Sequence, residues 1–201
     1  MLTLLLRFFR NSAQRYWNVR ARIQFGVRRV RWPNNLSVLG PLGLSANGKI
    51  EIGENVTIVN DTKYNRAGIN HPTQLVAAAG GHLRIGNHVG ISGGSIFCVK
   101  SIEIGNYVLI GASCRIYDTD FHPINYRDRR ESKKAASAEV VIQDDVWLGA
   151  NVTVLKGVTI GARSIIASGS VVTRDIPADT LAGGIPAKPI RMLSKQVQNK
   201  E

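Results

Sequence analysis

The chain has 201 residues, 26 lysines and arginines against 14 acidic residues, and a formal net charge of +12. A chain of this length favours a single domain. Its two cysteines argue against a disulfide framework, so nothing in the composition requires an oxidising compartment. The positive charge is concentrated near the amino terminus, without a known nucleic-acid module, so we expect no nucleic-acid partner.

Residues 1–40 form a basic amino-terminal segment. Residues 1–32 contain no acidic residue and eight arginines: Arg7, Arg10, Arg15, Arg20, Arg22, Arg28, Arg29 and Arg31. The apolar cluster between Leu2 and Phe9 is interrupted by Arg7, is too short to span a bilayer, and is not followed by a signal-peptide cleavage site. Three interpretations stay open: a helix that caps one end of the domain, an amphipathic segment on an anionic membrane surface, or an extended arm. We expect a cytoplasmic protein, and the second interpretation would add a peripheral contact with the inner face of the membrane through residues 1–32.

Residues 41–180 carry a repeat with a period of six. Apolar residues at six-residue steps are Ile52 and Ile58; Ile85, Ile91 and Phe97; Ile104, Ile110 and Ile116; and, without a break, Ile142, Leu148, Val154, Ile160, Ile166 and Val172. Small or β-branched residues follow the last set by four positions, at Val146, Val152, Val158, Ser164, Ser170 and Ile176. Neither an α-helix nor a flat strand has this period. It is typical of a parallel β-helix, an all-β solenoid of three-sided coils, and the length allows roughly five coils of 18 residues.

Glycines follow several of these apolar residues by one position, at Gly53, Gly86, Gly105, Gly111, Gly149 and Gly161. We expect a corner of the coil at each of them. Such a corner would use the positive φ that glycine adopts without steric cost.

Two insertions, 60–74 and 117–139, interrupt the repeat, and a tail with a short C-terminal helix, residues 181–201, is expected after it. Insertions in solenoids project to one face, often the binding face. The second insertion begins with Asp118, Asp120 and His122, which an extended strand would point to the same side. A carboxylate two residues before a histidine can orient its ring and leave the other nitrogen as a general base. A solvated surface histidine is the alternative interpretation.

The run VVIQDDVWLGANVTVLKGVTIGARSIIASGSVVTRDIPADTLAGGIPAKPIR, with its W-L-G step and its closing A-G-G-I-P-A-K element, resembles the signature of the hexapeptide-repeat acetyltransferases. The similarity covers roughly residues 80–192 and is greatest to the sugar and polysaccharide O-acetyltransferase branch. It implies a left-handed β-helix, a homotrimer with active sites between protomers, and acetyl-CoA as donor substrate. The acceptor implied is the hydroxyl of a glycan or of a lipid-linked sugar in surface polysaccharide biosynthesis.

The resemblance also assigns roles to residues by their position in the motif. It implies that His122, within D-F-H-P, is the general base of a direct attack on the thioester, with Asp120 and Asp118 beside it. Ser92, where related enzymes often have asparagine, and Trp147 would contact the substrate. The positions that match CoA contacts are Ala150, Ser168, Thr173, Arg174, Lys188 and Arg191.

Two other enzyme classes stay open. One is an acetyltransferase that acts on a small xenobiotic or an amino-sugar amine. The other is a zinc-dependent carbonic anhydrase of the γ type, which the same solenoid hosts and which needs converging histidines. The chain has four histidines, His71, His82, His88 and His122. His82 and His88 are one period apart, but no second histidine is close to His122 in sequence, so we expect no metal. Cys98 and Cys114 are expected to be inert, and Cys114 falls in the inward register.

Overall fold

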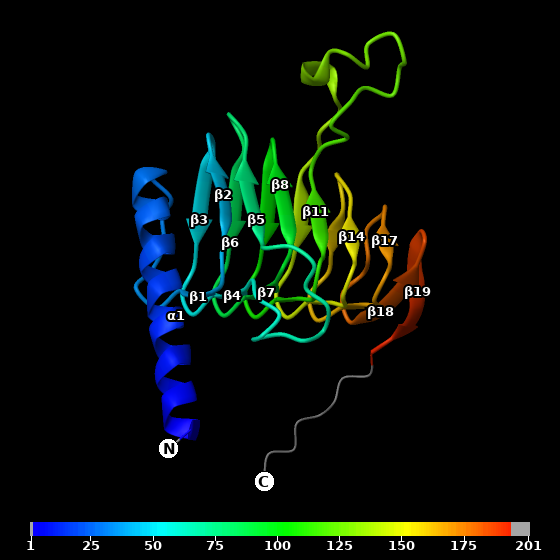
Figure 1. Cartoon of the computed structure of the whole chain (residues 1–201). Coiled ribbons are helices and arrows are strands. Elements are labelled where there is room, and N and C mark those ends of the chain that lie inside the picture. Colours follow the sequence, from blue (N-terminus) through cyan, green and yellow to red (C-terminus); the bar gives the residue numbers. More distant parts are fainter. Residues whose placement is uncertain (1, 194–201) are drawn as a thin grey trace.

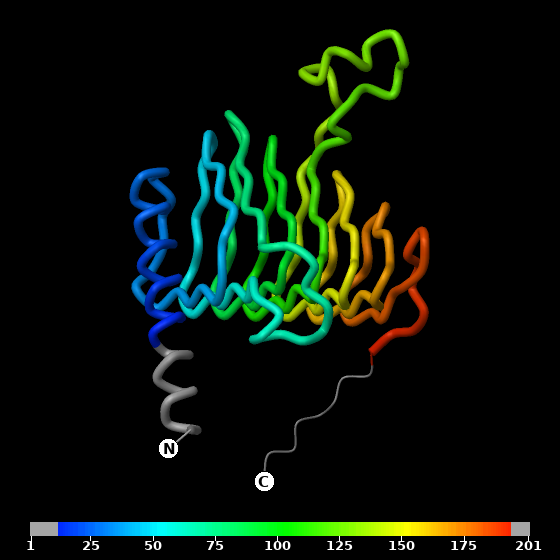
Figure 2. The backbone as a smooth tube through the Cα atoms, in the orientation of Figure 1, coloured from blue at the N-terminus to red at the C-terminus, as the bar shows by residue number. Residues whose placement is uncertain are grey.

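The chain winds into a stack of three-sided coils. The structure, a computed structural model, describes the backbone of residues 2–193 and the side chains of residues 12–193. Consecutive strands go to three different sheets in turn, so each coil contributes one strand to each sheet. Figures 1 and 2 show the coils side by side along one axis, with a long helix, α1 (Leu2–Val27), across the amino-terminal end.

The strands form three sheets, named A, B and C. Sheet B contains β1 (Ser37–Leu39), β4 (Thr57–Val59), β7 (Gly90–Ser92), β10 (Leu109–Ile110), β13 (Trp147–Leu148), β16 (Ile165–Ile166), β18 (Thr180–Gly184) and β19 (Ala187–Met192). Sheet C contains β2 (Gly43–Ala46), β5 (Gln74–Ala77), β8 (Ser95–Cys98), β11 (Arg115–Tyr117), β14 (Thr153–Val154) and β17 (Val171–Val172). Sheet A contains β3 (Lys49–Ile52), β6 (His82–Ile85), β9 (Ser101–Ile104), β12 (Val140–Ile142) and β15 (Thr159–Ile160). Neighbouring strands are parallel, apart from the antiparallel pair β18 and β19. The chain passes from B to C to A in each coil, which defines a B–C, a C–A and an A–B corner.

The six-residue repeat fills the axis of the stack, as the sequence predicts. All members of the unbroken set from Ile142 to Val172, and of its companion set from Val146 to Ile176, are at most 3% exposed. The two serines of the companion set are also buried, and their hydroxyls donate to backbone carbonyls, Ser164 to Pro177 at 2.7 Å and Ser170 to Ala167 at 2.6 Å. Each fully buried aliphatic side chain contributes about 1.5–3 kcal/mol relative to exposure.

One expected inward residue, Phe97, points outwards. Its neighbour Ile96 is buried instead and aligns with Leu75 and Ile116 in the adjacent coils. The paired glycines Gly93 and Gly94 make the preceding corner one residue shorter, so the strict step of six is wrong for this strand.

The corner glycines serve close approach between coils and not a positive φ. Positive φ occurs elsewhere, along the A–B corner at Asn55, His88, Tyr107, Asp145, Arg163 and Asp179. A Cβ on Gly86 would lie 2.5 Å from the carbonyl oxygen of Gly105, and one on Gly149 would lie 2.7 Å from the Ser168 nitrogen. The expectation that these glycines adopt a positive φ is therefore wrong. A side chain is excluded at these positions because the backbone of the next coil is too close.

Helix α1 closes the amino-terminal end of the stack. Asn18 accepts a hydrogen bond from the Val38 N–H at 2.7 Å, Ala21 and Phe25 are buried, and the Phe25 ring packs on Trp32 with 5.6 Å between centroids. These contacts confirm the capping helix for residues 12–27, while the side chains of Arg7 and Arg10 lie outside the described residues. Within the described part of the chain, no helix is both long enough and apolar enough to cross a membrane.

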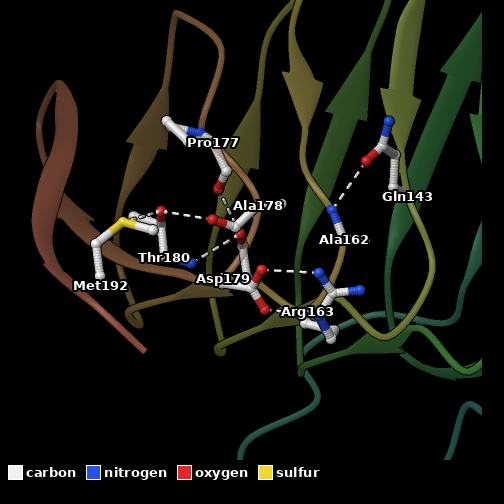
Figure 3. Close-up of polar contacts among 9 residues, drawn as sticks. Gln143, Ala162, Arg163, Pro177, Ala178, Asp179, Thr180 and Met192 are labelled. Atoms are coloured by element: carbon white, nitrogen blue, oxygen red, sulfur yellow. Dashed lines mark hydrogen bonds and ion pairs between the residues drawn. The ribbon is translucent and has the colours of Figure 1, made fainter. Parts of the chain in front are cut away.

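The carboxyl-terminal end of the stack is a β-hairpin. Strand β19 folds back on β18, so the short helix expected within 181–201 does not occur up to residue 193, and residues 194–201 lie outside the described residues. Figure 3 shows the guanidinium of Arg163 facing the carboxylate of Asp179, with two contacts of 2.6 and 2.7 Å. This ion pair raises the pKa of Arg163 above its ordinary value and ties two coils together at the A–B corner.

Two loops leave the coils where insertions are expected. The first, residues 60–73, joins β4 to β5 at the B–C corner. The second, residues 118–139, joins β11 to β12 at the C–A corner, contains the short 3₁₀ helix η1 (Ser132–Lys134), and projects away from the stack (Figure 1).

Candidate active site

Ser92 and Trp147, both expected to contact substrate, line one open hollow on sheet B. The hollow has a volume of about 210 Å³ and lies over β4, β7, β10 and β13. Trp147 is 50% exposed, and its neighbour in the parallel register, Leu109, is exposed as well. The hollow thus combines apolar walls with a hydroxyl, a composition typical of small-molecule sites.

The loop 60–73 is fixed beside this hollow by two asparagines. The side-chain amide of Asn65 donates to the hydroxyl of Ser92 at 3.0 Å, and the hydroxyl of Ser113 donates to the Asn70 side-chain oxygen at 2.9 Å. Sequence reasoning missed both asparagines. Their partners are 27 and 43 positions away, and nothing in a polar loop marks one amide among many.

His122 follows a tight turn at the start of the loop 118–139. Phe121 has a φ of 62°, and the His122 N–H donates to the Asp120 carbonyl at 2.7 Å, which closes a γ-turn. The Phe121 ring packs against Phe97 and Tyr117, with centroid distances of 4.9 and 5.2 Å. These aromatic contacts anchor the turn on sheet C and therefore fix the backbone next to His122.

The ring of His122 is oriented by a backbone carbonyl. Its Nδ1 lies 3.1 Å from the carbonyl oxygen of Arg129. Since a carbonyl oxygen can only accept, Nδ1 must carry the proton in this contact, and Nε2 of the neutral ring keeps its lone pair. The side chain is exposed, so this lone pair is accessible to a substrate. The arrangement selects the tautomer that a general base requires.

Asp118 does not lie beside the ring of His122. Its carboxylate is fully buried and accepts four hydrogen bonds of 2.7–3.0 Å from the N–H groups of Val99, Lys100 and Ser101 in the preceding coil. This geometry gives Asp118 a structural function at the C–A corner, where it satisfies three backbone donors at once.

Asp120 also has another partner. Its carboxylate forms an ion pair with Lys156 at 3.0 Å, one coil further along. The sequence pattern assumed an extended strand from Asp118 to His122, and the γ-turn at Phe121 breaks that geometry. The alternating arrangement is therefore wrong, and the carbonyl of Arg129 occupies the position expected for a carboxylate.

One chain does not bring His122 and Ser92 to the same place. Ser92 ends β7 at the B–C corner, beside the loop 60–73, whereas His122 belongs to the loop at the C–A corner. His122 thus lies at the C–A corner, whereas the hollow lies on sheet B.

The six expected CoA contacts fall into three groups. Ala150 and Ser168 stack in successive coils at the B–C corner, where the Gly169 N–H donates to the Ala150 carbonyl at 2.8 Å. Lys188 is close to them. It pairs with Gly183 across the hairpin of β18 and β19, and the N–H of the adjacent Gly184 donates to the hydroxyl of Ser170 at 3.1 Å. The remaining residues are apart from this corner: Thr173 and Arg174 are exposed after β17, and Arg191 is exposed opposite Leu181 on β19.

The thiols and the other histidines have structural surroundings. Burial raises the pKa of Cys98 to about 12 and that of Cys114 to about 11, so both stay protonated at neutral pH. His82 contacts Glu51 at 2.7 Å, whereas His88 stacks on Tyr107 with 4.7 Å between centroids. The two histidines therefore do not share a face, and the described residues contain no group of three or more potential metal ligands.

Comparison with known proteins agrees with this architecture. Residues 139–174 match the family model described as bacterial transferase hexapeptide (six repeats). A galactoside O-acetyltransferase from Lactococcus lactis is 42% identical over 93 residues, which are 46% of this chain and 44% of that protein. The alignment spans about half the length of the curated relatives that the chain matches.

Solved structures extend the likeness to most of the chain. A hexapeptide-repeat acetyltransferase from Vibrio cholerae, determined in complex with acetyl coenzyme A, is 38% identical over 71% of this chain and 70% of its own, with a TM-score of 0.58. A maltose O-acetyltransferase from Clostridium difficile is 25% identical over 96% of this chain and 84% of its own, with a TM-score of 0.61. The solenoid accordingly fits the left-handed β-helix expected from the sequence. The chain belongs to the hexapeptide-repeat transferase family.

Proposed function

We propose that the protein transfers an acetyl group from acetyl-CoA to a sugar hydroxyl in surface polysaccharide biosynthesis. Relatives named galactoside and maltose O-acetyltransferase, and a related structure holding acetyl coenzyme A, support the donor and the class of acceptor. The observation that carries the proposal is the contact between His122 Nδ1 and the Arg129 carbonyl, which leaves Nε2 ready to accept a proton.

In the proposed reaction His122 is the general base. Acetyl-CoA supplies an acetyl group activated as a thioester. Nε2 of His122 accepts the proton of the acceptor hydroxyl while the hydroxyl oxygen bonds to the thioester carbonyl carbon. The carbon–sulfur bond then breaks, and His122 returns the proton to the departing CoA thiolate, so the enzyme ends in its starting state. General bases of this kind typically contribute about 10²- to 10⁴-fold in rate.

Ser92 and Trp147 are proposed to bind the acceptor in the hollow on sheet B, with Asn65 holding the Ser92 hydroxyl. Ala150 and Ser168 would let the pantetheine arm approach the corner backbone, because both side chains are small. Lys188, beside them, and the exposed Arg174 and Arg191 would meet the phosphates of CoA.

We further propose that the working unit is a homotrimer with sites between protomers. Its support is the position of His122 at the C–A corner and of the hollow on sheet B. A second protomer placed along sheet B would bring its own loop 118–139 to this hollow.

The test is release of free thiol from acetyl-CoA by purified protein, over a panel of glycans that includes amino sugars. His122→Ala should keep the fold and CoA binding and lose at least about 10²-fold in turnover. His88→Ala is the matched control, since that histidine stacks on Tyr107 outside the hollow. A His122→Ala variant with a third or more of wild-type turnover would refute the assignment, and transfer to amines alone would replace the hydroxyl acceptor.

The trimer is tested by mixing two inactive chains. Co-expressed His122→Ala and Trp147→Ala chains should recover part of the activity, because some interfaces would then combine an intact base with an intact hollow. Sedimentation at micromolar concentration should give three copies of the chain. An active monomer would overturn the shared site.

A further inference from the structure

Helix α1 has a second face that the capping contacts leave uncovered. The face towards the coils carries Asn18, Ala21 and Phe25, which bond to or pack on the first coil. Opposite them lie Tyr16, Val19, Ile23 and Val27, which are 58%, 55%, 62% and 76% exposed. Their spacing of three and four residues places them along one stripe of the helix.

The surroundings of this stripe are strongly cationic. Arg20 lies within it, and its guanidinium is 5.4 Å from the centroid of the Trp17 ring. Arg15 lies one turn before Val19, and the exposed Arg28 and Arg29 directly follow the helix. The first acidic residue of the chain is Glu51, so no carboxylate of this segment offsets the charge.

The position of the helix makes this stripe an end surface of the molecule. α1 runs across the end of the stack, and the coils lie on one side of it only (Figures 1 and 2). A flat partner can therefore approach the outer side of the helix without meeting the loops, which leave the stack at the B–C and C–A corners.

We propose that the outer face of α1, formed by Tyr16, Val19, Arg20, Ile23 and Val27, binds the surface of an anionic lipid bilayer with the helix parallel to it. The two components of such binding are both present: apolar side chains that enter the boundary between headgroups and acyl chains, and arginines that attract anionic headgroups. Tyrosine and tryptophan beside them are residues that favour the membrane interface. A polyanion such as a nucleic acid would use the arginines and leave the apolar stripe in water.

This surface is independent of acetyl transfer, and its test needs no substrate. Full-length protein is sedimented with vesicles of phosphatidylglycerol and phosphatidylcholine in equal parts, and with vesicles of phosphatidylcholine alone, at low and at high salt. We expect binding to the anionic vesicles, weakened by salt, and much weaker binding to the neutral ones. Circular dichroism melting of each variant verifies the fold.

Two double variants separate the components. Arg20→Gln/Arg28→Gln should reduce the partition coefficient about fivefold per arginine. The control Arg66→Gln/Arg84→Gln removes the same charge from exposed positions elsewhere and should have little effect. Val19→Ser/Ile23→Ser keeps the charge and removes apolar contacts, and it should reduce binding at least about tenfold. Ile190→Ser, at another exposed isoleucine, is its control.

The outcomes decide between partners. Equal binding of wild type and Val19→Ser/Ile23→Ser to anionic vesicles would overturn the proposal and indicate simple attraction between charges. Absence of binding to anionic vesicles at low salt would overturn it as well. Thiol release with a soluble acceptor should stay unchanged in the Val19→Ser/Ile23→Ser variant, so a failed membrane test leaves the proposed acetyl transfer untouched.

Discussion

The side-chain amide of Asn65 donates a hydrogen bond of 3.0 Å to the hydroxyl of Ser92, and this contact joins the first insertion to the hollow on sheet B. The amide comes from a loop one coil earlier than β7 and meets the hydroxyl at the edge of the hollow.

Asn65→Ala should therefore weaken acceptor binding and leave the donor unaffected. Loss of one hydrogen bond of this kind is worth about 1 kcal/mol, so kcat/KM for the acceptor should fall roughly five- to tenfold while KM for acetyl-CoA stays constant. Asn70→Ala, which removes the contact of the same loop with Ser113, is the control for loosening the loop. Equal losses of kcat/KM in both variants would mean that Asn65 affects the acceptor only by keeping the loop ordered.

Gly86→Ala should destabilise the solenoid because the added methyl group has no space. Its Cβ would lie 2.5 Å from the Gly105 carbonyl oxygen and 3.0 Å from the Asn106 nitrogen, both backbone atoms that cannot move independently. We expect a loss of about 1–3 kcal/mol in the free energy of unfolding, measured by denaturant titration. Gly26→Ala in α1, whose Cβ would be 3.8 Å from the Trp32 ring, should be neutral or slightly stabilising. A neutral Gly86→Ala would show that adjacent coils can separate at this corner.

The period of six was sufficient to predict the coil, because a residue that points to the axis at every side must recur at every side. Local exceptions to this period depend on backbone geometry, which the spacing of apolar residues does not encode. The short corner at Gly93 and Gly94 moves the inward position from Phe97 to Ile96. The steric function of Gly86 depends on the next coil, which lies nineteen residues away at Gly105.

The site was predicted less completely than the fold. Ser92 and Trp147 do share a hollow, since strands one or two coils apart are adjacent in a solenoid. The arrangement around His122 could not be derived from spacing, because a single γ-turn at Phe121 redirects the chain. The contact of His122 with Arg129 spans seven positions within one irregular loop, and that of Asn65 with Ser92 spans 27 positions, so no periodic pattern encodes either of them.

Glu51 should make stability depend on pH in the acid range. Hydrogen bonds from His82 at 2.7 Å and then from Lys49 at 3.0 Å lower the pKa of its carboxyl from 4.5 to about 2. The ionised carboxylate is thus more favourable in the folded chain than in the unfolded chain. Its contribution to stability is complete above pH 4.5 and is lost as the pH falls towards 2.

Thermal melts of wild type and Glu51→Gln across this range are the measurement. The difference in Tm should be largest near neutral pH and should vanish at the acid end. Glu139→Gln is the control, since the carboxylate of Glu139 accepts its hydrogen bond from a neutral donor, the hydroxyl of Ser101. A difference in Tm that is independent of pH would contradict the ion pair as the cause.

Asp118→Asn should reduce stability more than it reduces catalysis. The buried carboxylate accepts from the N–H groups of Val99, Lys100 and Ser101, and an amide in its place would turn an NH₂ group towards one or more of these donors. Unsatisfied buried donors cost about 1–3 kcal/mol, and more where the lost acceptor was charged, so Tm should fall by roughly 5–10 °C. Asp120→Asn removes only a partly exposed ion pair with Lys156, for which a loss of at most about 1 kcal/mol is expected.

Turnover per folded molecule, measured well below Tm, should remain within about tenfold of wild type for Asp118→Asn, in contrast to the larger loss expected for His122→Ala. A stable Asp118→Asn protein with turnover as low as that of His122→Ala would instead give this carboxylate a direct part in the reaction, which its burial and its four backbone contacts argue against.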